Sequence, residues 1–137
     1  LKGDFYNKKI KKFVDQNKNM KFYLSLGHYY YLNALKHCDC VVGNSSSGLL
    51  EAPSFKIATI NIGDRQKGRL KAESVIDCGE DINSISKAFE KIYSEKFQAK
   101  LSNVKNPYGS GNSSQKIMSI IQNIEIPNSL RKKFYEI

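Results

Sequence analysis

The sequence predicts an α/β fold, in which a parallel sheet is covered by helices on both faces. Segments with helical spacing of apolar residues alternate along the chain with short β-branched runs, an order typical of parallel sheets. Polar segments follow two of the predicted strands, at residues 43–48 and 63–70. Ligands of such sheets bind at the carboxyl ends of the strands, so these two segments form the candidate site.

The N-terminal part of the chain predicts a helix, a strand and a second helix. Residues 5–16 place apolar side chains at helical spacing, with Asp4 as the expected N-cap. Residues 20–26 form an apolar run between an asparagine and a glycine, which predicts a strand. Residues 29–37 return to helical spacing.

The middle of the chain predicts three strands around a short helix. Residues 40–42 are expected to form a short buried strand, and residues 49–55 a short helix. Residues 57–62 are the clearest strand because their side chains are mainly β-branched. Another short strand is expected at residues 73–78.

The C-terminal part predicts helices. Asp81 is the expected N-cap of a helix that extends to about residue 95. Residues 101–111 are expected to form a loop, residues 112–123 a helix and residues 127–137 a final basic helix. The side chains of the Asp81 helix that we expect to face inward are Ile82, Ile85, Ala88, Phe89 and Ile92.

Length and composition predict one domain over residues 1–137, with enough apolar residues (40%) for a packed core. The apolar runs are too short to span a bilayer, and we expect neither a signal peptide nor a membrane partner. The chain begins with leucine and enters a helical pattern within a few residues, so we expect a fragment of a longer protein. Half of an active site can then lie outside it.

The net charge of +9, from 22 basic and 13 acidic residues, suits an anionic partner. By charge alone, nucleic acid, a membrane surface and a phosphorylated small molecule all fit, and scattered lysines are also common on plain solvated surfaces, so the charge decides little. Of the three cysteines, Cys38 and Cys40 are too close for a Cys-x-x-Cys zinc hook, and Cys78 is distant. We expect buried, reduced thiols in a cytoplasmic protein, and no metal site.

The segment Gly43–Gly48 (GNSSSG) joins a predicted strand to a predicted helix. Small residues let the backbone approach a phosphate, and free N–H groups with serine hydroxyls supply donors. The same segment can be an ordinary turn and N-cap. It is not a P-loop, because no Gly-Lys-Ser/Thr follows.

Two further features adjoin this segment in the predicted fold. Glu51 lies one turn beyond it and can accept hydrogen bonds from the hydroxyls of a ribose, although it can equally be a first-turn acid that the helix dipole stabilises. The loop after the best strand contains Arg65 and Arg69, two of the three arginines of the chain. Arginine binds phosphate in bidentate fashion, whereas the alternative here is a solvated loop.

Aromatic residues follow the first predicted strand, in Leu26–Tyr31 (LGHYYY). Aromatic rings near a strand end can stack on a base, but a run of tyrosines on a helix is more often packed in the core. His28 has no evident carboxylate or nucleophile partner in the sequence, so we interpret it as structural.

Four stretches together resemble the C-terminal domain of the UDP-N-acetylglucosamine 2-epimerase family. Their sequences are most similar to its hydrolysing bacterial branch. They are LSLGH with Tyr31-Leu32 (residues 24–32), VVGNSSSGLLEAP (41–53), INIGDRQKGR (60–69) and NPYGSGNSS (106–114). The resemblance implies two Rossmann-like domains in the GT-B arrangement, with UDP in the cleft between them. This chain would be the UDP-binding C-terminal half, and the first strand of that domain would be missing or truncated.

By position, the resemblance assigns each candidate residue a part of UDP. Leu26 would meet the uracil edge through its backbone and Tyr31 would lie against the base. Ser45, Ser46 and Ser47 would bind the diphosphate, and Glu51 the ribose hydroxyls. Arg65 would reach the phosphates, with Arg69 as a weaker candidate.

The family chemistry is anti elimination of UDP followed by hydration, which in the hydrolysing branch gives N-acetylmannosamine and UDP for sialic-acid-type synthesis. The resemblance implies UDP-N-acetylglucosamine or a diacetamido-trideoxy relative as substrate, no cofactor, and a homo-oligomeric full-length enzyme. The acid–base residues would belong to the absent N-terminal domain. We therefore expect no catalytic residue in this chain and no turnover from it alone.

Two other functions compete with this one. A GT-B glycosyltransferase shares the serine- and glycine-rich phosphate turn and the acidic ribose ligand. A basic nucleic-acid-binding module would suit the charge, but the basic residues form no stripe interleaved with exposed aromatics, and no RNA-binding signature is present.

Overall fold

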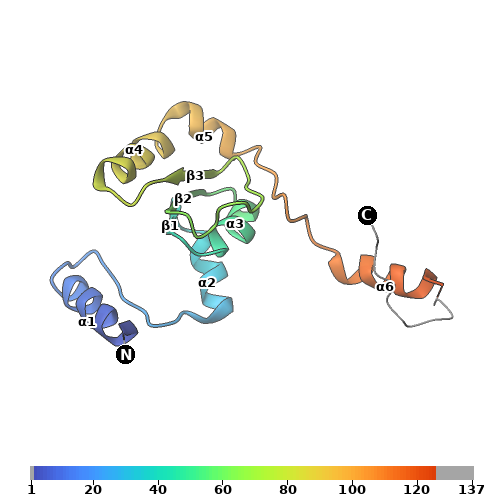
Figure 1. The fold of residues 1–137 in the computed structure, drawn as a ribbon, viewed down its shortest axis with the longest axis horizontal. Helices are drawn as coiled ribbons and strands as arrows, with labels where there is room; N and C mark the ends of the chain where they lie inside the picture. Colours follow the sequence, from blue (N-terminus) through green and yellow to red (C-terminus); the bar gives the residue numbers. More distant parts are fainter. Residues whose placement is uncertain (1, 126–137) are drawn as a thin grey trace, which may run out of the picture.

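The protein is described by a computed structural model, which covers residues 2–125. A three-stranded sheet forms its centre, built from β1 (Cys40–Gly43), β2 (Ala58–Ile62) and β3 (Val75–Cys78) in that order (Figure 1). Both strand pairs are parallel, with Val42 opposite Ile60 and Ile60 opposite Ile76. The predicted α/β fold with a parallel sheet is confirmed.

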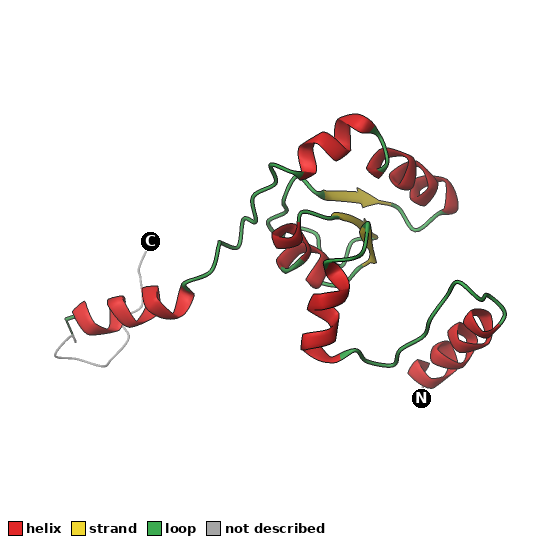
Figure 2. Ribbon diagram, turned by 180° about the vertical axis from the view of Figure 1, so that it is seen from behind, coloured by secondary structure: helices red, strands yellow, loops and turns green. Residues whose placement is uncertain are grey.

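Helices pack on both faces of the sheet, as Figure 2 shows from behind. On one face, Ile60 and Ile76 are buried with Ile92 and Phe97 of two C-terminal helices. Neighbouring residues in a strand point to opposite faces, so Thr59 faces the other helical layer. The helices are α1 (Lys2–Asp15), α2 (Gly27–Leu35), α3 (Ser47–Leu50), the 3₁₀ helix η1 (Ala52–Phe55), α4 (Ile82–Ile92), α5 (Glu95–Leu101) and α6 (Ser113–Asn123).

The predicted helix from Asp81 to residue 95 is in fact two helices. Asp81 caps α4 as predicted, since its Oδ1 accepts a hydrogen bond from the Ser84 N–H at 2.9 Å. Ser94 then starts a second helix, α5, because its hydroxyl accepts from the Phe97 N–H. The prediction of inward-facing side chains was also partly wrong, because Ile82 is 81% exposed and Phe89 is exposed as well.

The predicted strand at residues 20–26 does not form. These residues connect α1 to α2, and no segment within residues 2–125 pairs with them. An apolar run becomes a strand only when a neighbouring strand takes up its backbone hydrogen bonds. Helix α1 stands apart from the sheet (Figure 1), and Asp4 lies in its first turn instead of capping it.

The predicted helix at residues 49–55 is divided into α3 and η1. Pro53 has no N–H to continue α-helical bonding, and the chain tightens into a 3₁₀ turn in which the Ser54 N–H donates to the Glu51 carbonyl at 3.0 Å. Helix α6 agrees with the prediction, and all its residues are exposed. The predicted helix at residues 127–137 lies outside the described residues.

Candidate functional site

The segment between β1 and α3 is held close to the sheet. Strand β1 ends at Gly43, whose φ of 144° lies in the region that only glycine adopts without strain. Ser46 takes the N-cap position of α3, but its hydroxyl bonds to no backbone N–H. The Ser45 hydroxyl accepts a hydrogen bond from the Ser47 N–H at 3.3 Å. The segment thus places three serine hydroxyls at the carboxyl end of β1, while the N–H groups of Ser47 and Gly48 are bonded to Ser45 within the turn.

A buried hydrogen bond helps to hold α3 against β2. The Thr59 hydroxyl donates to the Gly48 carbonyl at 2.9 Å, and both residues are buried. A Cβ atom added to Gly48 would lie 2.5 Å from Thr59 Cγ2. Glycine therefore allows α3 to approach the strand more closely than any other residue would.

Helix α2 joins the same segment through Tyr31. Its hydroxyl forms a hydrogen bond with the hydroxyl of Ser47. Tyr31 also lines a hollow of about 620 Å³, together with Leu26 and the residues before α2. The positions predicted for base and diphosphate are thus adjacent.

The loop after β2 meets the serine-rich segment directly. The side-chain amide of Gln66 donates to the Asn44 carbonyl at 2.7 Å, and Gln66 is only 2% exposed. Arg65 is the preceding residue, so its backbone lies beside the first segment. Arg69 lies three residues further along this loop, and its backbone N–H donates to the Gln66 carbonyl at 3.3 Å.

The charged candidates differ in their surroundings. Glu51 is half-buried, and its buried Oε2 has no hydrogen-bond partner. Arg65 and Arg69 are exposed, and neither side chain is hydrogen-bonded or ion-paired within the part of the chain that the structure describes. The two guanidinium groups are therefore open to a ligand, whereas the Glu51 Oε2 is buried and would have to turn outward to reach one.

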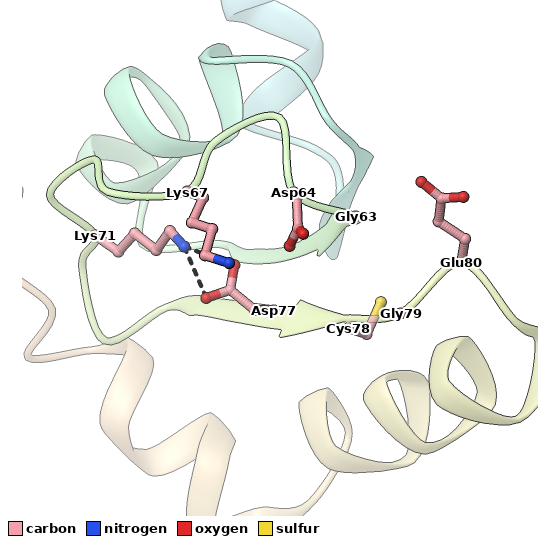
Figure 3. A pocket seen from close by; sticks show the side chains of 8 residues that line it. All are labelled: Gly63, Asp64, Lys67, Lys71, Asp77, Cys78, Gly79 and Glu80. Carbon is pink, nitrogen blue, oxygen red and sulfur yellow. Dashed lines mark hydrogen bonds and ion pairs between the residues drawn. The ribbon is translucent and has the colours of Figure 1, made fainter.

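A second hollow, of about 570 Å³, opens at the carboxyl ends of β2 and β3 (Figure 3). Asp64, Lys67, Lys71 and Asp77 line it, and the Lys71 Nζ lies 2.8 Å from an Asp77 carboxylate oxygen. Asp64 and Lys67 belong to the predicted segment 63–70, but no pattern in the sequence pointed to Lys71 or Asp77. Glu80 also lines it, so three carboxylates face two lysines, and the hollow is less suited to a diphosphate than the serine-rich segment.

The carboxylate of Asp77 is stabilised in its ionised form. Partial burial by itself raises the pKa of Asp77, but hydrogen bonds from Lys71 and Asn61 and the positive charge of Lys71 outweigh it. The pKa therefore lies below its ordinary value. Within residues 2–125, no three His, Cys, Asp or Glu side chains gather closely enough to hold a metal ion.

The three cysteines are free, but the expectation that they are buried was wrong. Cys38 is exposed, and Cys40 and Cys78 are only partly buried. Burial, followed by the charges of neighbouring groups, raises the pKa of both Cys40 and Cys78.

A parallel α/β sheet with serine- and arginine-bearing segments at neighbouring strand ends is suited to binding a phosphorylated ligand. The sequence profile of the UDP-N-acetylglucosamine 2-epimerase family matches residues 2–122. The chain belongs to this family, which confirms the resemblance seen in the sequence.

Curated relatives support the same membership. The polysialic acid biosynthesis protein P7 of Escherichia coli is 39% identical over 136 residues, which make up 98% of this chain and 34% of that protein. The GDP/UDP-N,N′-diacetylbacillosamine 2-epimerase (hydrolyzing) of Campylobacter jejuni is 39% identical over 137 residues, covering 98% and 35%. The UDP-N-acetylglucosamine 2-epimerase of Neisseria meningitidis is 32% identical over 115 residues, covering 82% and 30%.

The chain spans about a third of the length of these relatives. Among its described helices, none has the length and apolar character needed to cross a membrane. The structure brings the two strand-end segments together and places Tyr31 and Glu51 beside the first of them. The role of each residue toward UDP stays a prediction.

Proposed function

We propose that this chain is the UDP-binding half of a hydrolysing UDP-sugar 2-epimerase of sialic-acid-type synthesis. Family membership supports a sugar-nucleotide substrate, and two of the relatives described above bear the names of 2-epimerases. The observation that carries the proposal is the hydrogen bond from Gln66 to Asn44, which joins the two strand-end segments. A diphosphate can then contact serine hydroxyls on one side and a guanidinium on the other.

In this proposal each part of UDP has its own ligands. Ser45, Ser46 and Ser47 donate to the diphosphate, while Arg65, assisted by Arg69, neutralises its charge. The carboxylate of Glu51 accepts from the ribose hydroxyls, once its Oε2, which is buried without a partner, has turned toward the ligand.

The uracil ring lies in the hollow lined by Leu26 and Tyr31. There the Tyr31 ring packs against the base, and the backbone of Leu26 meets the base edge.

The contribution of this half to catalysis would be electrostatic. Elimination places negative charge on the departing diphosphate, and fixed donors that meet this charge lower the barrier. The acid–base groups would come from outside residues 1–137, so the chain alone binds UDP without turning over UDP-N-acetylglucosamine. Release of UDP from that sugar nucleotide by the isolated chain would contradict this division.

Calorimetric titration tests the proposal, with UDP and 2′-deoxy-UDP as ligands. The unchanged chain should bind UDP more tightly than 2′-deoxy-UDP, because Glu51 accepts a hydrogen bond from the 2′-hydroxyl. Glu51→Gln should weaken UDP binding by about tenfold, the effect of losing a charged hydrogen bond, and should reduce the preference for ribose. Glu90→Gln, on an exposed position of α4, is the matched control. Equal affinity of the unchanged chain for the two ligands would refute the ribose assignment.

A further inference from the structure

We infer that Gln66 is a positioning residue, which sets the arrangement of the serine-rich segment for the diphosphate without touching the ligand. The inference rests on the proposed UDP-binding function. It concerns a residue that carries no charge and was not among the candidates from the sequence.

The geometry separates Gln66 from its neighbours in the charged loop. Asp64, Arg65 and Lys67 are exposed, whereas Gln66 is 2% exposed. Its amide nitrogen lies 2.7 Å from the carbonyl oxygen of Asn44, 22 residues earlier in the chain. A loop that is otherwise solvated thus sends one side chain inward to hold the backbone of the other segment.

The held carbonyl lies at the point where the segment turns. Asn44 follows Gly43, whose positive φ directs the chain out of β1, and precedes the three serines. On its far side, the segment is fixed by the Thr59 hydroxyl, which donates to Gly48. Gln66 therefore holds one end of the serine-rich turn and Thr59 the other.

Holding both ends restricts the orientations of the serine N–H and hydroxyl groups between them. A segment that adopts the binding arrangement only part of the time binds with an affinity reduced by that fraction. Arg65 is adjacent to Gln66 in the chain, so the same hydrogen bond also limits the separation between the Arg65 backbone and the serines. The expected consequence of losing the bond is weaker binding of the diphosphate, with the base and ribose contacts unchanged.

Gln66 can be replaced by methionine, which has nearly the same volume, to remove its hydrogen bond. Its Oε1 is buried without a hydrogen-bond partner. Gln66→Met removes this unsatisfied acceptor together with the donor at nearly constant volume, and Asn44 is an exposed residue that water can reach. Removing one partner of a hydrogen bond destabilises the fold when the other is left buried and unpaired, and does so less when water can replace the lost partner. The thermal unfolding of the variant therefore has to be measured beside its binding.

Gln98→Met, at an exposed position, is the control for losing a glutamine-to-carbonyl hydrogen bond elsewhere in the chain. The Gln98 amide also donates to a backbone carbonyl, that of Ile92 at 2.6 Å, but it lies in α5 on the other side of the sheet. This variant loses the same kind of hydrogen bond at a distance from the two strand-end segments.

The experiment compares UDP and uridine binding by calorimetry, with thermal unfolding of each variant as a check on folding. Gln66→Met should lower UDP affinity by about tenfold if the binding arrangement is then populated about a tenth of the time. Uridine affinity should change by less than about twofold, because uridine has no diphosphate to meet the serine-rich segment. A purely structural defect would instead weaken the binding of both ligands. Gln98→Met should bind both ligands like the unchanged chain.

Amide hydrogen exchange supplies a readout that needs no ligand. Gln66→Met should speed exchange at residues 44–48 and leave α4 and β3 unchanged. If the unchanged chain binds UDP and Gln66→Met binds it equally well, or loses UDP and uridine affinity alike, the positioning role is overturned and UDP binding stands. If the unchanged chain binds no UDP, the proposed function and this inference fall together.

Discussion

Substituting Gly48 by alanine tests the close approach of α3 to β2. The new Cβ would lie 2.5 Å from Thr59 Cγ2 and 3.4 Å from Thr59 Oγ1. Thr59 is buried, and turning its side chain would break the hydrogen bond to the Gly48 carbonyl. The helix must therefore move outward by about 1 Å to reach ordinary carbon–carbon contact.

The expected destabilisation follows from these contacts. Overpacking a well-packed site costs about 1–3 kcal/mol, and the buried threonine on a central strand places this site in the upper part of that range. Alanine in a helix recovers about 0.5–1 kcal/mol relative to glycine. We expect Gly48→Ala to lower the free energy of unfolding by about 2 kcal/mol.

A double-mutant cycle with Thr59→Ser isolates the contact. Serine retains the hydroxyl that bonds to Gly48 and removes the methyl group that would clash. Urea unfolding followed by circular dichroism should show Thr59→Ser alone to be destabilised by about 1 kcal/mol. The double variant should be more stable than the sum of the single effects predicts, by at least about 1 kcal/mol. Additivity within about 0.3–0.5 kcal/mol would refute the steric reasoning.

Three further predictions concern other parts of the molecule. Asn106→Ala removes two 2.7 Å hydrogen bonds to the region of α3 and η1, and should lower the thermal midpoint in a melt followed by circular dichroism. Because the pKa of Asp77 is lowered in the folded chain, its ion pair with Lys71 should stabilise the fold above the ordinary carboxyl pKa. That contribution should be lost as the pH falls through the lowered pKa, so the difference in urea midpoint between the unchanged chain and Asp77→Asn should shrink in acid. Exposed Cys38 should react with iodoacetamide faster than Cys78, whose pKa is raised, and peptide mass spectrometry after timed labelling would measure this.

The central strand and the location of the site were predictable because they depend on local patterns. The β-branched run predicted a strand at residues 57–62, and β2 begins one residue later, at Ala58. The alternation of helices and strands predicted that the strands are parallel. Since parallel neighbouring strands end at the same edge, the two polar segments were expected to meet there. The N-cap role of Asp81 was also predictable, because it directly precedes a segment with helical spacing of apolar residues.

Other features depend on contacts that a single sequence does not display. The apolar run at residues 20–26 satisfies the pattern of a strand, but strand formation needs a partner, and none lies beside it in the described chain. Gln66 is one polar residue in a charged loop, and only the fold shows that it turns inward to Asn44. The break between α4 and α5 could have been found, because Ser94 before Glu95 is a typical helix start.

The most direct test of the account is to follow backbone amide resonances of the chain by NMR while UDP is added. We expect the amides of residues 44–48 and 63–69 to shift together along one binding curve, with those of α4 and α5 unchanged. Shifts confined to one of these segments, or centred on the lysines of α1 (Lys8, Lys9, Lys11 and Lys12), would contradict the claim that the two strand-end segments form one diphosphate site.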